Sequence, residues 1–307
     1  MRYGVKHTRI GLVALMVFTG SVATAQITIG DYTGWTGWMT SNNVLMQDVV
    51  ADQQTGQGQD DFSGDATYAG FQQKAGLLDP GTGTAVDHIM FRARMQKYDS
   101  KGFGGNWEMG MDLDGDGGLD LVMKMSDKQS TEITFATPGT GANDSPSNTT
   151  FGSFAGAVAL DANTYKYENA TAYDSGKVTG TPTKNDNAWV TFAISFANLQ
   201  TAIQTYAVSS TDNTTTFSGY TLTYSSTIAY IAFTSTQGNA INQDLFGTTG
   251  NLNSISTFAS LGGMTGPLNS GGVVPEPATY IQLGVILLVG VGAMIWRRRR
   301  DSAIALE

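Results

Sequence analysis

The chain alternates between short apolar runs and clusters of Gly, Asn, Asp and Ser, and several runs show the period of two that is typical of β-strands. In Trp107–Leu113, for example, the large apolar side chains occupy the odd positions. Because successive side chains of a strand point to opposite faces, this pattern predicts sheets with a buried face. Strands are predicted at Ile89–Met95, Trp107–Leu113, Leu119–Met125, Glu132–Ala136, Phe154–Leu160, Ala188–Phe196, Thr215–Tyr224 and Ile228–Phe233.

One segment, Phe196–Tyr206, has the pattern of a short helix instead. The strand-rich pattern therefore predicts a mainly β protein, with an antiparallel β-sandwich or jelly-roll-like body over residues 26–261. Long loops are expected at 53–64 and 138–150. The amide- and hydroxyl-rich segment 232–244 is expected to bond the backbone of a loop, and contact with a ligand is the alternative.

The first residues have the pattern of a secretory signal peptide. Basic residues precede an apolar run from Ile10 to Phe18, and the small residues Ala23-Thr24-Ala25 follow. An amphipathic first helix is disfavoured because the apolar run carries no polar face. We expect residues 1–25 to be removed and Gln26 to begin the mature chain.

The last residues predict a membrane span. Ala278–Trp296 holds no charged residue and would extend about 28 Å as a helix, which matches the hydrocarbon core of a bilayer. The arginine cluster Arg297, Arg298, Arg299 and Arg300 follows at once and should remain cytoplasmic, before a short tail at 301–307. A buried core helix is the alternative, but four consecutive arginines are hard to place beside one. The body is therefore expected outside the cytoplasmic membrane.

Just before this span lies the motif Pro275, Glu276 and Pro277, which follows a Gly/Ser/Asn-rich linker at 262–274. The two prolines prevent a helix and hold the backbone extended, which would expose the motif to a membrane-embedded peptidase. Together, the motif, the single span and the arginine cluster resemble the PEP-CTERM sorting signal of bacteria that make exopolysaccharide. The body is weakly similar to uncharacterised β-rich proteins that carry this signal.

This resemblance implies that an exosortase, an integral-membrane cysteine protease, recognises Pro275, Glu276 and Pro277 and releases or transfers the body. The membrane anchor would then be transient, and the mature protein would reside at the cell surface or in the extracellular matrix. A permanent single-span anchor, with the motif as a stalk turn, is the alternative.

The amino-acid composition argues against one class of partner and excludes cysteine chemistry. Residues 26–296 contain 10 Lys and Arg against 24 Asp and Glu, and such an acidic body argues against nucleic acid as a partner. The chain has no cysteine, so neither disulfides nor thiol chemistry are available. Since the resemblance to PEP-CTERM proteins implies a surface or matrix destination, we expect a non-enzymatic structural protein associated with biofilm or exopolysaccharide.

The segment from Asp112 to Asp120 carries the sharpest local motif. Carboxylates at Asp112, Asp114, Asp116 and Asp120 occupy positions 1, 3, 5 and 9, with glycine at position 6, as in calcium-binding loops. The backbone carbonyl of Gly118 would add a ligand. Met123 replaces the usual glutamate at position 12, and the flanks look like strands, so the motif predicts a Ca²⁺ loop within a β-hairpin. A metal-free acidic turn is the alternative.

The tryptophans suggest a second class of function. Trp35 and Trp38 lie in a Gly/Thr loop and are candidates for stacking on sugar rings, whereas Trp107 and Trp189 lie in strands and are expected in the core. Exposed stacking at Trp35 and Trp38 would make the protein a calcium-dependent polysaccharide-binding adhesin module.

A secreted hydrolase is the third and weakest hypothesis. The only histidine after the signal peptide is His88, which we expect on a strand facing solvent or at a sheet edge, so a histidine-based triad or metal site is nearly excluded. Paired carboxylates could still cleave a glycosidic bond, and Glu108 is the first candidate. A structural glutamate on a strand explains Glu108 equally well.

Overall fold

The computed structural model describes residues 26–40, 44–52, 60–128, 130–139, 151–170, 187–212, 214–235, 241, 244–247 and 268–269. The expected signal peptide, sorting motif, membrane helix, arginine cluster and terminal tail all lie outside these residues. In the part of the chain that is described, no helix is long and apolar enough to cross a membrane.

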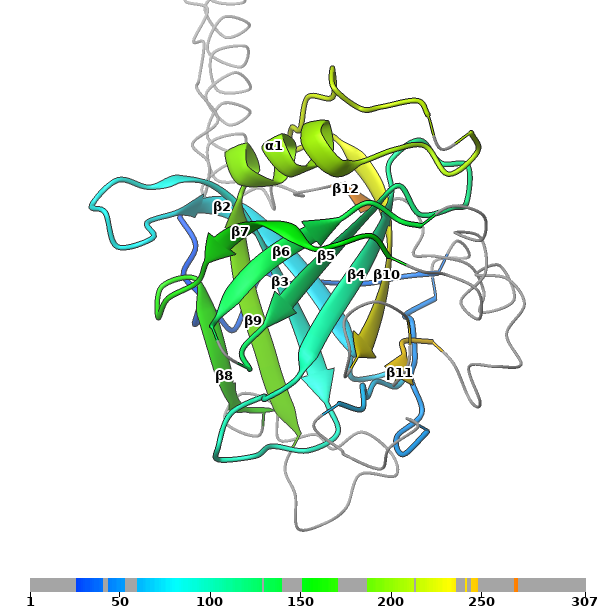
Figure 1. Cartoon of the computed structure of the whole chain (residues 1–307). Coiled ribbons are helices and arrows are strands. Elements are labelled where there is room, and N and C mark those ends of the chain that lie inside the picture. Colours follow the sequence, from blue (N-terminus) through cyan, green and yellow to red (C-terminus); the bar gives the residue numbers. More distant parts are fainter. Residues whose placement is uncertain are drawn as a thin grey trace, which may run out of the picture.

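The described residues form two antiparallel sheets and one short helix, so the chain is mainly β as predicted (Figure 1). The five-stranded sheet has the order β1 (Thr36–Gly37), β2 (Phe71–Leu78), β3 (Val86–Met95), β9 (Ala188–Ser195), β8 (Tyr165–Asn169). The seven-stranded sheet has the order β11 (Asp244–Leu245), β10 (Thr227–Ser235), β4 (Asn106–Asp112), β5 (Leu121–Ser126), β6 (Glu132–Ala136), β7 (Ala155–Ala159), and β12 (Leu268–Asn269) also pairs with β10.

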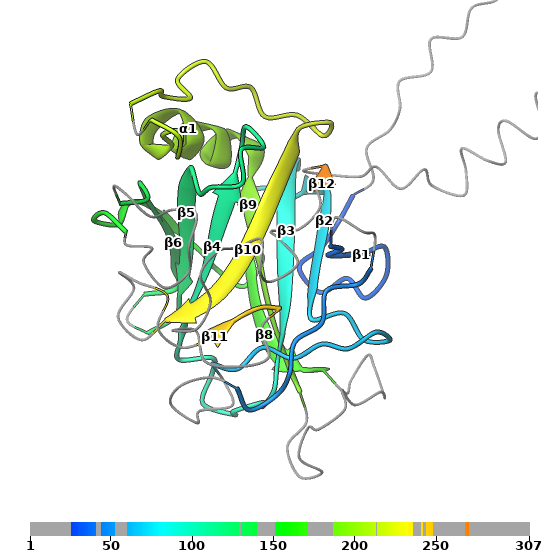
Figure 2. The same cartoon turned by 90° about the vertical axis from the view of Figure 1, so that its right-hand side faces the viewer.

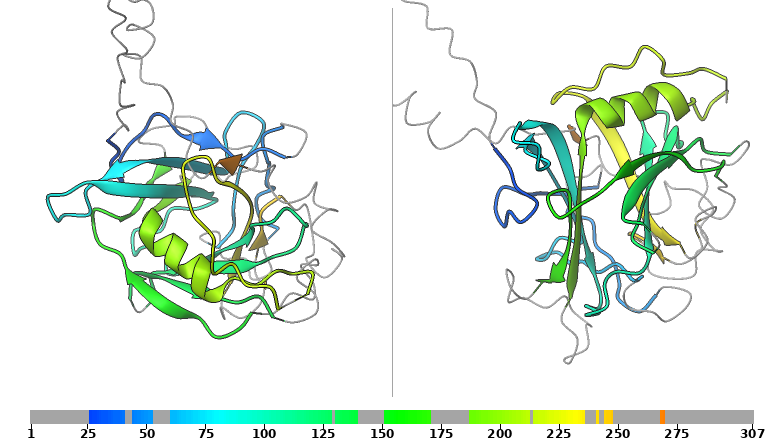
Figure 3. Two further views of the ribbon diagram at one scale, coloured as in Figure 1. Left: turned by 90° about the horizontal axis from the view of Figure 1, so that it is seen from above. Right: turned by 60° about the vertical axis from the view of Figure 1, so that its left-hand side comes forward.

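The two sheets face each other across a shared apolar core, and they appear as two layers in Figures 2 and 3. Aromatic rings meet across this core: Trp107 of β4 lies 4.8 Å from Phe192 of β9, and Phe91 of β3 lies 5.5 Å from Tyr230 of β10, between ring centroids. Trp107 and Trp189 are both buried, as expected. Edge-to-face pairs of this kind add to the stabilisation that burial provides.

Helix α1 (Phe196–Tyr206) covers one end of the space between the sheets (Figure 1). It begins where β9 ends, because the Ser195 Oγ accepts a hydrogen bond from the Asn198 N–H at 3.2 Å and so caps the first turn. Its buried side chains, on one face of the helix, are Phe196, Leu199, Ala202 and Ile203. The helix therefore has the bounds that the sequence predicts.

Most of the predicted strands are present, but the strand predicted at 215–224 is wrong, and the sequence analysis missed β2 and β8 as well as the two-residue strands β1, β11 and β12 of the described chain. β2 was missed because its buried face includes Gln73 and Ala75, which are weak hydrophobic signals, and the short edge strand β8 alternates tyrosine with charged residues. The strand predicted at 215–224 is instead a loop with turns, in which Leu222 is buried against the core. The alternating apolar side chains of this segment contact the core although its backbone forms no strand. Within the described chain, the only β-bridge of this segment is the one between Val208 and Thr216.

Part of the segment predicted as a linker, at 262–274, forms a short strand instead. Leu268 and Asn269 form β12, which pairs with Ile228 and Thr227 of β10. Asn269, six positions before Pro275 in the sequence, therefore still pairs with the seven-stranded sheet.

Candidate metal centre

The predicted calcium loop connects β4 to β5 as a hairpin. Met111 pairs with Leu121 at the end of the ladder, and the Asp120 N–H donates to the Met111 carbonyl at 2.8 Å. Gly115 and Gly117 have φ angles of 82° and 90°, in the left-handed region that glycine adopts without strain. Met123, at the position of the missing glutamate, is a buried core residue of β5.

Three carboxylates converge in this loop. One oxygen from each of Asp112, Asp114 and Asp120 lies within 4.8 Å of the others. Two oxygens that each lie about 2.4 Å from a calcium ion can be at most about 4.8 Å apart, so the observed spacing is compatible with one shared ion. Asp112 and Asp120 are buried while Asp114 is exposed, and solvent therefore reaches the group from the side of Asp114.

Backbone N–H groups hold the two buried carboxylates in place. The Gly115 and Gly117 N–H groups donate to the two oxygens of Asp112, at 2.6 and 3.1 Å. The Leu113 N–H donates to Asp120 Oδ2 at 2.7 Å, and the Ser210 N–H donates to Asp120 Oδ1 at 3.1 Å. The oxygens are thus oriented before any ion binds, which lowers the cost of binding.

Burial raises the pKa of Asp120 to about 7 and also raises the pKa of Asp112, and the neighbouring carboxylates add to both shifts. A divalent cation would stabilise the charged forms and reverse these shifts. Proton release and metal binding should therefore be coupled here.

Asp116 does not join this group, although the sequence placed it among the ligands. Its carboxylate turns to the loop after α1, where it accepts hydrogen bonds from Ser210 Oγ at 2.8 and 2.7 Å and from Thr211 Oγ1. Burial raises the pKa of Asp116, but hydrogen bonds from Thr211, Gly118 and Ser210 outweigh it and the pKa is lowered. Gly118 donates its N–H to Asp116 Oδ1 at 2.8 Å, and its carbonyl as a ligand stays a prediction.

Ser209 is a further candidate donor that the sequence did not single out. Its hydroxyl donates to Asp114 Oδ2 at 3.2 Å, and its oxygen could serve a hard cation as well. Ser209 is 95 residues away from Asp114 in the chain, so no local spacing could reveal the contact.

No family model, curated protein or solved structure matches the chain.

The two tryptophans proposed for sugar stacking lie in different surroundings. Trp38 is 0% exposed, with Phe71 and Tyr230 stacked at 4.7 and 5.3 Å between ring centroids, so its predicted exposure is wrong. The residue directly follows β1, and its N–H donates to the Phe71 carbonyl, which turns the indole into the core.

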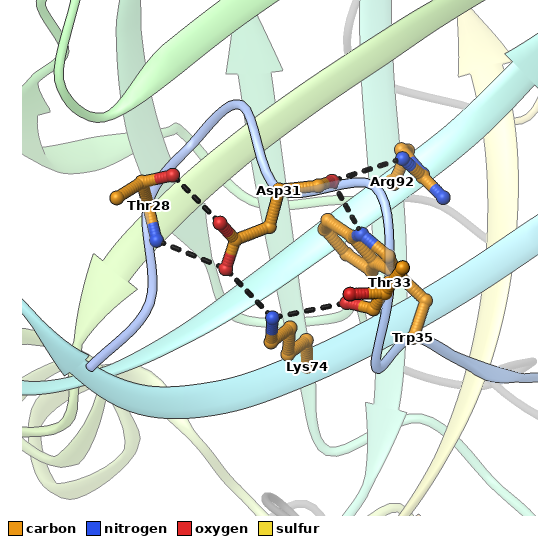
Figure 4. A network of polar contacts seen from close by, with 6 residues as sticks. All are labelled: Thr28, Asp31, Thr33, Trp35, Lys74 and Arg92. Carbon is orange, nitrogen blue, oxygen red and sulfur yellow. Dashed lines mark hydrogen bonds and ion pairs between the residues drawn. The ribbon is translucent and has the colours of Figure 1, made fainter. Parts of the chain in front are cut away.

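Trp35 is partly buried, and Figure 4 shows its surroundings. Its Nε1–H donates to the Asp31 carbonyl at 2.8 Å, and the Arg92 guanidinium lies 4.2 Å from the ring centroid. Arg92 also lies 4.4 Å from the Trp189 ring, while Asp31 pairs with Lys74 at 2.6 Å. The arginine covers one face of Trp35 and thereby restricts its access to a sugar ring.

His88 and Glu108 are both buried. The solvent exposure expected for His88 is wrong, because β3 lies between β2 and β9, and His88 is 4% exposed with Nδ1 2.9 Å from the Val86 carbonyl. Burial lowers its pKa. Glu108 is 0% exposed, and burial raises its pKa to about 8, so it lies out of reach of a polymer substrate.

Proposed function

We propose that this protein is the precursor of an exported cell-surface or extracellular-matrix protein, associated with biofilm or exopolysaccharide. An exosortase processes it at Pro275, Glu276 and Pro277 after transient anchoring in the cytoplasmic membrane. The released body is a β-sandwich of jelly-roll type with a structural, non-enzymatic role, and it binds Ca²⁺ in the β4–β5 hairpin. Because the body is acidic and nucleic acid is anionic, we do not propose nucleic acid as a partner.

The support for export and sorting comes from the two ends of the sequence. A basic and apolar leader ends in Ala23-Thr24-Ala25, and the PEP motif, the apolar stretch and the arginine cluster follow one another within the last part of the chain. Each feature alone is common, but their order is specific to a sorted surface protein.

The observation that carries the role of the body is the convergence of Asp112, Asp114 and Asp120 within 4.8 Å in a hairpin between two core strands. An ion here would tie the hairpin to the loop at Ser209–Ser210, since the same carboxylates accept hydrogen bonds from that loop. Calcium would thus stiffen one end of a protein that has no disulfide.

The alternatives receive less support from the geometry. A polysaccharide-binding adhesin would use Trp35 and Trp38, yet Trp38 is buried and Arg92 covers one face of Trp35. A secreted hydrolase would need an accessible acid, and its first candidate, Glu108, is fully buried.

Mass spectrometry of the C-terminus tests the sorting proposal. The protein is expressed in a host that has its exosortase, as the wild type, as Pro275→Ala/Pro277→Ala, and as the control Pro267→Ala, which alters a proline upstream of the motif. We expect the wild type and the control to appear outside the cell and to end near Pro277, and the double variant to keep its tail in the membrane. An intact tail in all three would make the protein a permanent membrane protein and refute the proposal.

A further inference from the structure

Three segments that are distant in sequence meet at the edge of the molecule where β11 lies. Asp48 pairs with Gly64 through two backbone hydrogen bonds, at 2.8 and 3.3 Å. The Gly247 N–H, just after β11, donates to Asp48 Oδ1 at 2.7 Å, and the Phe62 N–H donates to Asp244 Oδ2 at 2.6 Å. Asp48 and Asp244 are therefore held firmly by main-chain donors.

Carboxylates from these segments gather at one point. One oxygen from each of Asp48, Asp52 and Asp244 lies within 4.8 Å of the others, which is the spacing that a single calcium ion allows. Asp48 and Asp244 are only 3% and 1% exposed. Asp61 lies nearby, is fully buried and accepts a hydrogen bond from the Ala51 N–H at 2.7 Å.

This group differs from an ordinary acidic surface cluster in one respect. Asp48 Oδ2 is buried and accepts no hydrogen bond from any residue that the structure describes. An unpartnered buried carboxylate oxygen costs about 1–3 kcal/mol or more, so a native protein normally supplies a partner for it.

The charges around Asp48 also favour a bound cation. Burial raises the pKa of Asp48 well above its usual range, and Asp244, Asp52 and Asp61 raise it further. Burial likewise raises the pKa of Asp244, with Asp61 and Asp52 adding to the shift. The described part of the chain places no Lys, Arg or His within ion-pair distance of either carboxylate.

We propose that Asp48, Asp52 and Asp244 bind a second divalent cation, and that this cation is Ca²⁺. The donors are all oxygens, which excludes the soft metals, and Mg²⁺ would retain more of its water than a buried group of carboxylates allows. Asp48 Oδ2 supplies a ligand that has no other partner. The ion fastens the segment at 44–52, which bridges to the strand-like residues at 62–64, onto β11 at the edge of the seven-stranded sheet. The site stands on its own geometry and does not depend on the hairpin site.

The test is calcium binding to the full-length chain in detergent micelles, after removal of metal with EDTA. Bound Ca²⁺ is measured by equilibrium dialysis with elemental analysis, and thermal unfolding is followed in parallel by circular dichroism. The variants are Asp48→Asn and Asp52→Asn. The matched control is Asp79→Asn, at a half-buried aspartate whose Oδ1, which asparagine retains, accepts three main-chain N–H bonds. Asp114→Asn reports on the hairpin site separately.

We expect Asp48→Asn to bind one ion fewer than the wild type, and Asp52→Asn to bind calcium at this site at least tenfold more weakly. In EDTA, Asp48→Asn should melt at a higher temperature than the wild type, because the amide requires neither a buried like charge nor the uptake of a proton at neutral pH. In calcium it should melt at a lower temperature than the wild type. Asp52 is partly exposed, so Asp52→Asn decides the question if Asp48→Asn does not fold. Unchanged stoichiometry and affinity in the folded variants would overturn the proposal, whereas loss of an ion in Asp114→Asn alone would leave only the hairpin site.

Discussion

Ser210 Oγ lies 2.8 and 2.7 Å from the two carboxylate oxygens of Asp116, and this contact joins the β4–β5 hairpin to the loop that follows α1. The two residues are 94 positions apart in the chain. The contact explains why Asp116 leaves the ligand group and why the hairpin keeps its shape before an ion binds.

The first prediction concerns this contact. Ser210→Ala removes a hydrogen bond to a charged carboxylate and should lower the free energy of unfolding by about 1 kcal/mol in EDTA. Urea denaturation measures the change, and Ser100→Ala, an exposed serine in a turn, is the control. Equal stability of the two variants would mean that Asp116 is held by Thr211 and the backbone alone.

The second prediction concerns the close approach of Gly118 to Ser210. A Cβ at Gly118 would lie 2.1 Å from Ser210 Oγ and 2.5 Å from Ser210 Cβ, so Gly118→Ala should force the two loops apart. We expect a loss of about 1–3 kcal/mol in the free energy of unfolding, as is typical of overpacking. Gly219→Ala, where the added Cβ meets nothing within 4 Å, should change little. The Ser210→Gly background should rescue Gly118→Ala, and a failure of this rescue would place the strain elsewhere.

The third prediction concerns pH. Burial raises the pKa of Glu108 from 4.5 to about 8, which Lys124 and Lys128 offset only in part, and neither oxygen has a hydrogen-bond partner among the described residues. Between these two values the unfolded chain is ionised at this residue while the folded chain keeps the proton. Stability should therefore fall as pH rises through this window, by at most about 1.4 kcal/mol per pH unit.

Glu108→Gln replaces the titrating carboxyl with a neutral amide. The free energy of unfolding of this variant should therefore rise relative to that of the wild type between pH 5 and pH 8. Urea midpoints across this range measure the difference, and Glu132→Gln, a half-buried glutamate of β6, serves as the control. Parallel profiles for the wild type and Glu108→Gln would show that the carboxyl of Glu108 is ionised in the folded protein.

The fourth prediction separates the two tryptophans. Trp38→Ala should cost about 3–5 kcal/mol in the free energy of unfolding, because it leaves a cavity between Phe71 and Tyr230. Trp35→Ala should cost less, since Trp35 is only partly buried and packs on Arg92. If Trp35→Ala instead abolished binding to an exopolysaccharide while the fold remained intact, the adhesin hypothesis would gain over the structural one.

The sequence predicts well what depends on neighbouring residues. The cap at Ser195 and the pattern after it define α1, and the Gly-rich acidic turn between two alternating strands defines the β4–β5 hairpin. Asp112, Asp114 and Asp120 come together as their spacing predicts.

Contacts between distant segments are not visible in the sequence. The turn of Asp116 toward Ser210, the approach of Asp48 to Asp244 and the burial of Trp38 beside Tyr230 each depend on how the sheets pack. Asp48 and Asp244 appear in the sequence as ordinary polar loop residues, because only the fold removes them from water.

Calcium binding by the hairpin gives the most direct test of the proposed body. Equilibrium dialysis of the full-length protein compares the wild type with Asp114→Asn and Asp116→Asn. We predict that Asp114→Asn loses one bound ion and part of the rise in melting temperature that calcium produces, while Asp116→Asn keeps the ion, because Asp116 lies outside the converging group. If Asp114→Asn bound as much calcium as the wild type, with the same affinity, the hairpin would be a metal-free turn and the calcium-stiffened body would be refuted.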